Sequence, residues 1–206
     1  MQTLPTQHTA IADLARSRLD VVGSPAAPDA LALFETAAAM GNETAIGGMF
    51  ELLVAIDLPT YDPSRAAGMI SQTVNQQNAA VLNVLLGRYR RADPSAKAVI
   101  DTALDMPEIY LIAAQSGDVL SMRAYAVHLR DAATGGDDLS TSTAWFKRAA
   151  QGGDVTAMAE YGCALTFGIG TDADLDAAVG WLEQAADAGS AKAASVTTLL
   201  NLNEDT

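Results

Sequence analysis

The sequence predicts an all-α fold, a right-handed α-solenoid of antiparallel helix pairs, and three observations support this. Hydrophobic residues make up 50% of the 206-residue chain, aromatic residues only 5%, and alanine supplies much of the apolar content. Alanine favours helices and lets them approach closely. One pattern repeats every 36 residues, as it does in stacked helical arrays. At the repeat junctions, a glycine precedes a residue that can cap a helix.

The 36-residue period is carried by three kinds of marker. The markers are the segments "AAQSGD", "AAQGGD" and "AADAGS" at Ala113, Ala149 and Ala185, the tryptophans Trp145 and Trp181, and the tyrosines Tyr125 and Tyr161. Further back, Gly41 lies in the same kind of turn, and Gln77 follows it by 36 residues. Gln77 and Gly117 are 40 residues apart. This repeat therefore holds about four extra residues, expected in "ADPS" or around 105–107.

The period divides the chain into consecutive helix pairs. We expect a single domain over residues 1–206, with an N-terminal helix pair at 1–41, four repeats, and a C-terminal capping helix and tail at 190–206. The repeats are 42–77, 78–117, 118–153 and 154–189. About eleven helices follow from this division. Their expected bounds include 6–22, 28–40, 154–167, 175–188 and 190–202.

The junctions have a physical explanation. Glycine can adopt the left-handed conformation that ends a helix. The residues that follow are all of types that cap the first free amides of the next helix. They are Asn42, Asn78, Asp118, Asp154 and Ser190. Gln77 lies where the other junctions have glycine, so we expect a looser turn there.

The C-terminal part of the chain resembles the Sel-one-like repeat (SLR) family, a relative of the tetratricopeptide repeat. The resemblance covers about the last 90 residues and is carried by matching positions in the segment "AMAEYGCALTFGIGTDADLDAAVGWLEQAADAGSAKA". The matching residues are Ala157, Gly162, Gly168, Gly170, Ala178, Trp181, Ala185, Ala186 and Gly189. Tyr161 and Leu165 depart from the pattern. The resemblance implies a TPR/SLR-like superhelix that serves as an adaptor or scaffold and does not usually catalyse.

Net charge, cysteine content and the pattern of apolar residues indicate which partners, disulfides and location to expect. The formal net charge of −13 would repel nucleic acids and anionic membrane surfaces. Cys163 is the only cysteine, so no intramolecular disulfide is possible. The first twenty residues lack the pattern of a signal peptide, and no apolar run reaches the length of a transmembrane helix. We therefore expect a cytoplasmic protein.

No pattern of residues predicts catalysis, a metal site or a cofactor. Cys163 with His128 could form a nucleophile and base on adjacent helices, but ordinary packing of both residues is the favoured interpretation. The spacing of Asp172, Asp174 and Asp176 is similar to the start of a calcium loop, but the twelfth position, Glu183, lies two residues after Trp181 in the repeat core, so calcium is not the favoured interpretation. Asp172 or Asp174 is better explained as the N-cap of the next helix.

The preferred hypothesis is a non-catalytic module that binds a protein or peptide partner, such as one with acidic residues, on the concave solenoid surface. The candidate contact residues are Arg88, Arg91, Arg123, His128 and Glu160. Arg88 and Arg91 belong to "GRYRR", for which the favoured interpretation is that the cations complement the dipole at a helix end. The alternative is a homodimer formed through an end repeat, where Leu199, Leu200 and Leu202 offer an apolar patch.

Overall fold

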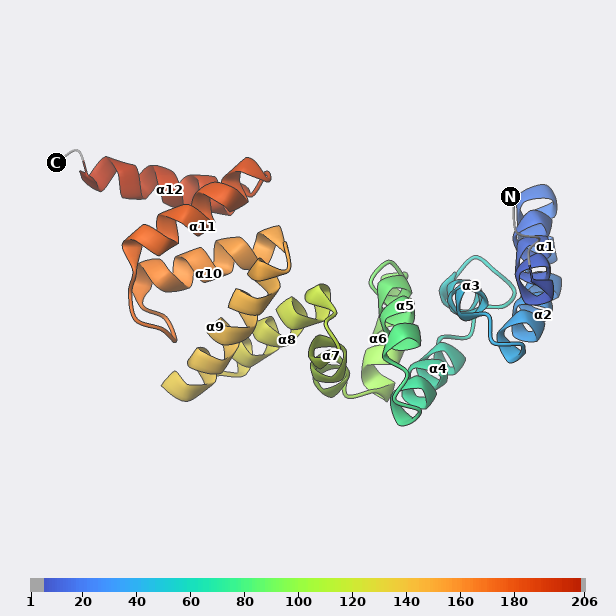
Figure 1. The fold of residues 1–206 in the computed structure, drawn as a ribbon. Helices are drawn as coiled ribbons and strands as arrows, with labels where there is room; N and C mark the ends of the chain where they lie inside the picture. The colour runs from blue at the N-terminus through green and yellow to red at the C-terminus, as the bar shows by residue number, and fades with distance from the viewer. Residues whose placement is uncertain (1–5, 205–206) are drawn as a thin grey trace. The chain divides into compact units, whose positions relative to one another are not determined.

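The computed structural model describes residues 6–204, and within that range every regular element is a helix (Figure 1). The all-α prediction is therefore confirmed. The helices group into two compact units, Met1–Met106 and Pro107–Thr206, called unit 1 and unit 2 below. A single domain over residues 1–206 stays a prediction.

The observed helices follow the predicted bounds closely. Unit 1 contains α1 (Gln7–Val22), a 3-10 turn η1 (Ser24–Ala26), α2 (Ala27–Ala39), α3 (Glu43–Val54), α4 (Pro63–Asn75), α5 (Ala79–Tyr89) and α6 (Pro94–Ala103). Unit 2 contains α7 (Met106–Gln115, beginning at the boundary), α8 (Val119–Ala132), α9 (Gly136–Gln151), α10 (Val155–Phe167), α11 (Leu175–Asp187) and α12 (Ala191–Glu204). The expected helices at 154–167 and 175–188 are thus α10 and α11.

One more α-helix is present in the described range than the sequence predicts, because the 78–117 repeat contains three. Pro94 begins α6, and Leu104 ends it in an extended conformation with φ −130° and ψ 146°. Pro107 then lies in the first turn of α7, where a residue without an amide proton is tolerated. The break falls at one of the two places where extra residues were expected.

The repeat junctions have the predicted construction. Positive φ angles occur at Gly41 (87°), Gly117 (101°), Gly153 (91°) and Gly189 (94°). At all five junctions, the side chain of the next residue accepts the amide of the third residue beyond it, over 2.8–3.3 Å. The backbone amide of the capping residue also donates to the helix that has just ended, as Asp154 does to Ala149 at 3.1 Å. Each junction therefore satisfies both helix ends locally.

Gln77 closes its junction with the same pair of bonds, and its backbone bond is the longest of the five junctions, 3.3 Å against 2.9–3.1 Å, in keeping with the expected looser turn. Its φ of 53° is the one positive value at a non-glycine residue in the described chain. The Asn78 amide donates to the Thr73 carbonyl at 3.3 Å, and the Asn78 side chain accepts the Val81 amide at 3.1 Å. These bonds hold glutamine in the left-handed region, where a side chain costs about 1–2 kcal/mol.

The core of unit 2 consists of small residues surrounded by aromatic rings. Ala157 is fully buried, and a β-carbon at Gly162 would lie 2.7 Å from Cγ of Leu182. The predicted close approach of these helices is therefore confirmed. Trp181 is half-buried at the edge of this core and meets Tyr161 edge to face, with ring centroids 5.7 Å apart. The Tyr125–Trp145 pair repeats that contact at the same distance, a favoured aromatic geometry.

The loop between α10 and α11 is fixed against the start of α9. Gly170 has a φ of 64°, and a β-carbon there would overlap the carbonyl group of Leu139. Thr143 donates its hydroxyl proton to the Ile169 carbonyl at 2.9 Å. Because the loop is held at both points, it forms a fixed wall beside α9.

Candidate functional site

Arg88 and Arg91, predicted as contact residues, lie in unit 1 beside Glu51. Arg88 forms an ion pair with Glu51, and the Arg91 guanidinium lies 4.0 Å from the same carboxylate. A cavity of about 420 Å³ adjoins them, and Asp57 and Asp93 also line it. Arg88 is engaged with a carboxylate of its own chain, whereas the Arg91 side chain is 66% exposed.

Arg123 lies in unit 2 and joins two neighbouring repeats. Its Nε donates to Oδ2 of Asp154 over 2.9 Å. The other carboxylate oxygen of Asp154 accepts the Ala157 amide at 2.8 Å, and the Asp154 side chain is only 6% exposed. One carboxylate therefore caps α10 and ties it to α8.

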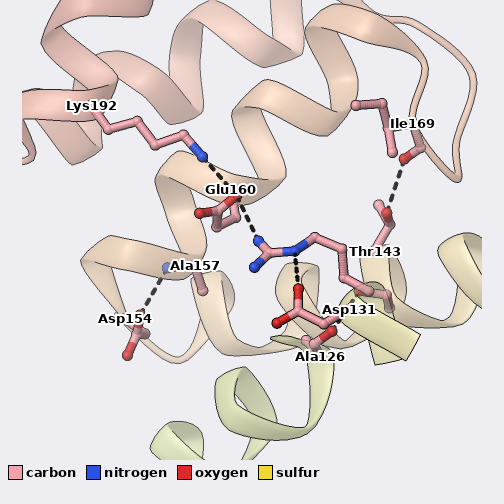
Figure 2. A network of polar contacts seen from close by, with 10 residues as sticks. Ala126, Asp131, Thr143, Asp154, Ala157, Glu160, Ile169 and Lys192 are labelled. Carbon is pink, nitrogen blue, oxygen red and sulfur yellow. Dashed lines mark hydrogen bonds and ion pairs between the residues drawn. The ribbon is translucent and has the colours of Figure 1, made fainter. Parts of the chain in front are cut away.

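Glu160 is the central member of a second charged cluster in unit 2 (Figure 2). Its Oε2 lies 3.3 Å from Nη1 of Arg130 on α8 and accepts a bond from Nζ of Lys192 on α12 at 2.8 Å. We call Arg130, Glu160 and Lys192 the charged ladder, because they link α8, α10 and α12. Nε of Arg130 also donates to Asp131 at 3.1 Å. His128, the remaining predicted residue, is exposed on α8.

The charged ladder borders a pocket of about 330 Å³, called the unit 2 pocket below. Its apolar lining comes from α9, α10, the α10–α11 loop and α12. These residues are Leu139, Phe146, Ala164, Phe167, Ile169 and Val196. Phe146 is 3% exposed, while Phe167 is 68% and Ile169 43% exposed. The pocket thus has a buried aromatic floor and an accessible apolar edge.

Two hydroxyl groups in the pocket wall are already satisfied by backbone carbonyls. Ser142 donates to the carbonyl of Ala126 at 2.7 Å, and Thr143 donates to that of Ile169 at 2.9 Å. These bonds use the hydroxyl protons within the fold. The interior of the pocket is therefore apolar in character, and its ionic groups are at the rim.

Cys163 lies half-buried in the pocket wall. Burial raises the pKa of its thiol above the ordinary value, Lys192 opposes this effect, and Glu160 adds to it. A raised pKa keeps the thiol protonated near neutral pH, the opposite of an activated nucleophile. Cys163 packs against the core cluster that contains Leu182 and Ala193, whereas the predicted base His128 is exposed on α8.

The carboxylates of the α10–α11 loop include a helix cap. Oδ1 of Asp174 accepts the Ala177 amide at 3.0 Å, as the capping interpretation predicted. The described residues contain no group of three or more His, Cys, Asp or Glu side chains placed to hold a metal ion. Among the described helices, none combines the length and apolar character needed to cross a bilayer.

Sequence reasoning named Glu160 but missed Arg130 and Lys192. A signal was present in the spacing of the ion pairs. The pairs Arg130–Glu160, Arg123–Asp154 and Glu160–Lys192 are separated by 30, 31 and 32 residues. These spacings fall short of the 36-residue period by four to six residues, between one and two helical turns. Contacts between the first helices of successive repeats, α8, α10 and α12, therefore join residues at different repeat positions. A search for opposite charges at this offset would have found the charged ladder.

Comparisons with known proteins agree with this architecture. The family model of the Sel1 repeat matches residues 25–42, 135–154 and 155–190. A solved structure of a protective antigen from uropathogenic Escherichia coli strains, displaying an SLR fold, is 19% identical with a TM-score of 0.64. The match covers 90% of this chain and only 39% of the antigen. A Sel1 repeat protein from Oxalobacter formigenes is 16% identical with a TM-score of 0.60, over 91% of this chain and 75% of that one. A search of curated proteins finds no match.

Proposed function

We propose that this chain, a Sel1-like repeat protein, is a non-catalytic adaptor or scaffold that binds a protein or peptide partner through unit 2. Sel1 repeats typically form protein-interaction modules, and stacked helix pairs present extended surfaces suited to that role. The observation that carries the proposal is the unit 2 pocket, with its apolar interior and charged rim. Apolar pockets with a few polar groups that fix orientation are typical of binding sites.

The predicted contact residues enter the proposal in different ways. Glu160 lines the pocket directly, and exposed His128 lies on α8. Arg123 supports the scaffold through Asp154. Arg88 and Arg91 belong to unit 1, where they line the cavity beside Glu51 and stay predicted contacts. A cytoplasmic location is part of the same proposal, in keeping with a chain whose only cysteine is Cys163.

Site-specific photocrosslinking tests the proposal. A photoreactive phenylalanine at position 167 would report on the pocket edge. The same group at position 175 is the matched control, because Leu175 is 56% exposed and does not line the pocket. We expect partner adducts from native lysate at position 167 that are absent at 175 and are lost when Leu139→Glu fills the pocket with a charge. Equal adducts at both positions, or none at 167, would contradict the proposal.

The homodimer alternative depends on one side chain of α12. Leu199 is 62% exposed, whereas Leu200 packs against the core formed with Leu182. The side chain of Leu202 lies outside those described. If α12 is a dimer interface, light scattering should show a dimer that Leu199→Asp converts to a monomer. A monomer at all concentrations would exclude this alternative.

A further inference from the structure

We propose that the unit 2 pocket recognises a partner segment in which one large apolar side chain adjoins a carboxylate. The apolar side chain would enter between Phe146 and Phe167, and the carboxylate would bind Arg130 and Lys192 at the rim. This inference rests on the proposed function, and it assigns the chemistry of the partner.

The size of the pocket favours a single inserted side chain. Its volume of about 330 Å³ is at the lower end of the range for ligand sites, roughly 300–1,000 Å³. The exposed ring of Phe167 at the edge and the buried ring of Phe146 at the floor give an inserted side chain aromatic contacts at both depths. Central, desolvated contacts of this kind dominate binding energy in interfaces.

The distribution of charge in unit 2 favours a carboxylate beside that side chain. From residue 107 onward, the chain has five basic and fourteen acidic residues. Two of those five cations, Arg130 and Lys192, line this one pocket. Acidic segments are therefore repelled by most of the unit and attracted at the pocket rim.

Both cations have donor capacity beyond their contacts within the fold. A guanidinium group carries five N–H donors, and the hydrogen bond and ion pair of Arg130 use Nε toward Asp131 and Nη1 toward Glu160. An ammonium group carries three donors, and Lys192 uses one toward Glu160. A partner carboxylate can thus bind both cations while Glu160 keeps them in position, and charge-assisted bonds of this kind are strong.

A basic partner segment is less well matched to the rim, although the whole chain is acidic. Glu160 is the only carboxylate in the pocket lining, and it is already shared by two cations. A third cation would have to displace one of them. The negative charge of the chain acts at long range and is screened by salt, whereas the rim acts at contact distance.

Fluorescence anisotropy with short labelled peptides tests the inference on the full chain. The probes share the frame Gly-Ser-X-Z-Ser-Gly, with X-Z as Phe-Asp, Phe-Asn, Phe-Lys or Ala-Asp. We expect Phe-Asp to bind about tenfold tighter than the other three, the scale of one charge-assisted contact or one buried aromatic anchor. Bound Phe-Asp peptide should also slow alkylation of Cys163, the only cysteine, which lies in the pocket wall.

Substitutions assign the effect to the rim. We expect Arg130→Gln and Lys192→Gln each to bring Phe-Asp affinity down to the Phe-Asn level, while Arg130→Lys retains part of the preference. Lys147→Gln is the matched control, because Lys147 is exposed on α9 and does not line the pocket. Lys192 is 51% exposed, so its variant should fold even if Arg130→Gln is destabilised.

The outcomes separate this inference from the proposed function. Tighter binding of Phe-Lys, or Phe-Asp binding that survives both glutamine variants, would overturn the inference. Equal competition by free 3-phenylpropionate would overturn it too, because a small carboxylate would then be sufficient. If no peptide binds but position 167 still crosslinks a partner, only the inference fails. If crosslinking also fails, the proposed function fails with it.

Discussion

Asp154 joins two repeats through one carboxylate, and its replacement by alanine should weaken unit 2 more than loss of an ordinary cap. The change removes the cap bond to the Ala157 amide, worth about 0.5–2 kcal/mol. It also removes the 2.9 Å bond from Arg123, and hydrogen bonds to charged groups contribute about 1.5–3 kcal/mol. Because Arg123 is 34% exposed, water replaces part of that contact. We therefore expect a loss of about 2–3 kcal/mol in the free energy of unfolding.

Urea unfolding followed by tryptophan fluorescence measures this loss, because both tryptophans of the chain, Trp145 and Trp181, lie in unit 2. Asp154→Asn keeps a cap acceptor and removes the charge, so it should lose about half as much. Ser190→Ala is the matched control, because the Ser190 hydroxyl caps its helix by accepting the Ala193 amide at 3.3 Å. If Asp154→Ala costs no more than Ser190→Ala, the carboxylate does not couple the repeats. The same conclusion follows if Arg123→Met is equally costly with and without Asp154.

Three other substitutions and one measurement on the unchanged chain test the scaffold and the pocket. Gln77→Gly should raise the free energy of unfolding by about 1 kcal/mol in a thermal melt followed by circular dichroism, because it relieves a positive φ. Trp181→Ala should cost about 3 kcal/mol and speed hydrogen exchange in α10–α12 but not in α1 and α2, since contacts in an array are local; uniform acceleration would contradict this. Gly170→Ala should cost about 2 kcal/mol or more in urea unfolding, because the methyl group overlaps the Leu139 carbonyl at positive φ. Alkylation of Cys163 by iodoacetamide should reach half its maximal rate at a higher pH in the folded chain than in urea, because burial raises its pKa and the thiolate is the nucleophile; coincident profiles would show that the thiol is not desolvated.

The parts of the fold that depend on neighbouring residues could be predicted from sequence. A capping side chain acts three residues away, so Asn42 and Asp154 identify helix starts without knowledge of packing. Residue type alone does not predict that Gln77 adopts the conformation of the junction glycines. The hydrogen bonds on both sides of Gln77 outweigh its preference and hold it in the glycine conformation.

The candidate site depends on how helices cross, which the period does not specify. Equal repeat positions predict which residues do the same job in each repeat, such as Trp145 and Trp181. They do not predict which residues of neighbouring repeats touch. The Arg130–Glu160 contact joins positions that are six residues apart in the repeat, because the first helices of neighbouring repeats pack with an offset. Arg130 and Lys192 were therefore overlooked, while Arg123 was chosen without its partner Asp154.

The charged ladder does not recur at the 36-residue period, and this argues that it serves binding and not the scaffold. Scaffold residues recur at the period, as the junction glycines and the edge-to-face aromatic pairs do. The ladder positions do not. One period away from the ladder residues lie Ala124 and Val196 for Glu160, Thr166 for Arg130, and Thr156 for Lys192. The repeat stacks without these charges elsewhere, so stacking does not require them. Surface ion pairs of this exposure contribute little to stability, and a local role in recognition explains why three charged residues meet at the rim of the one apolar pocket described in unit 2.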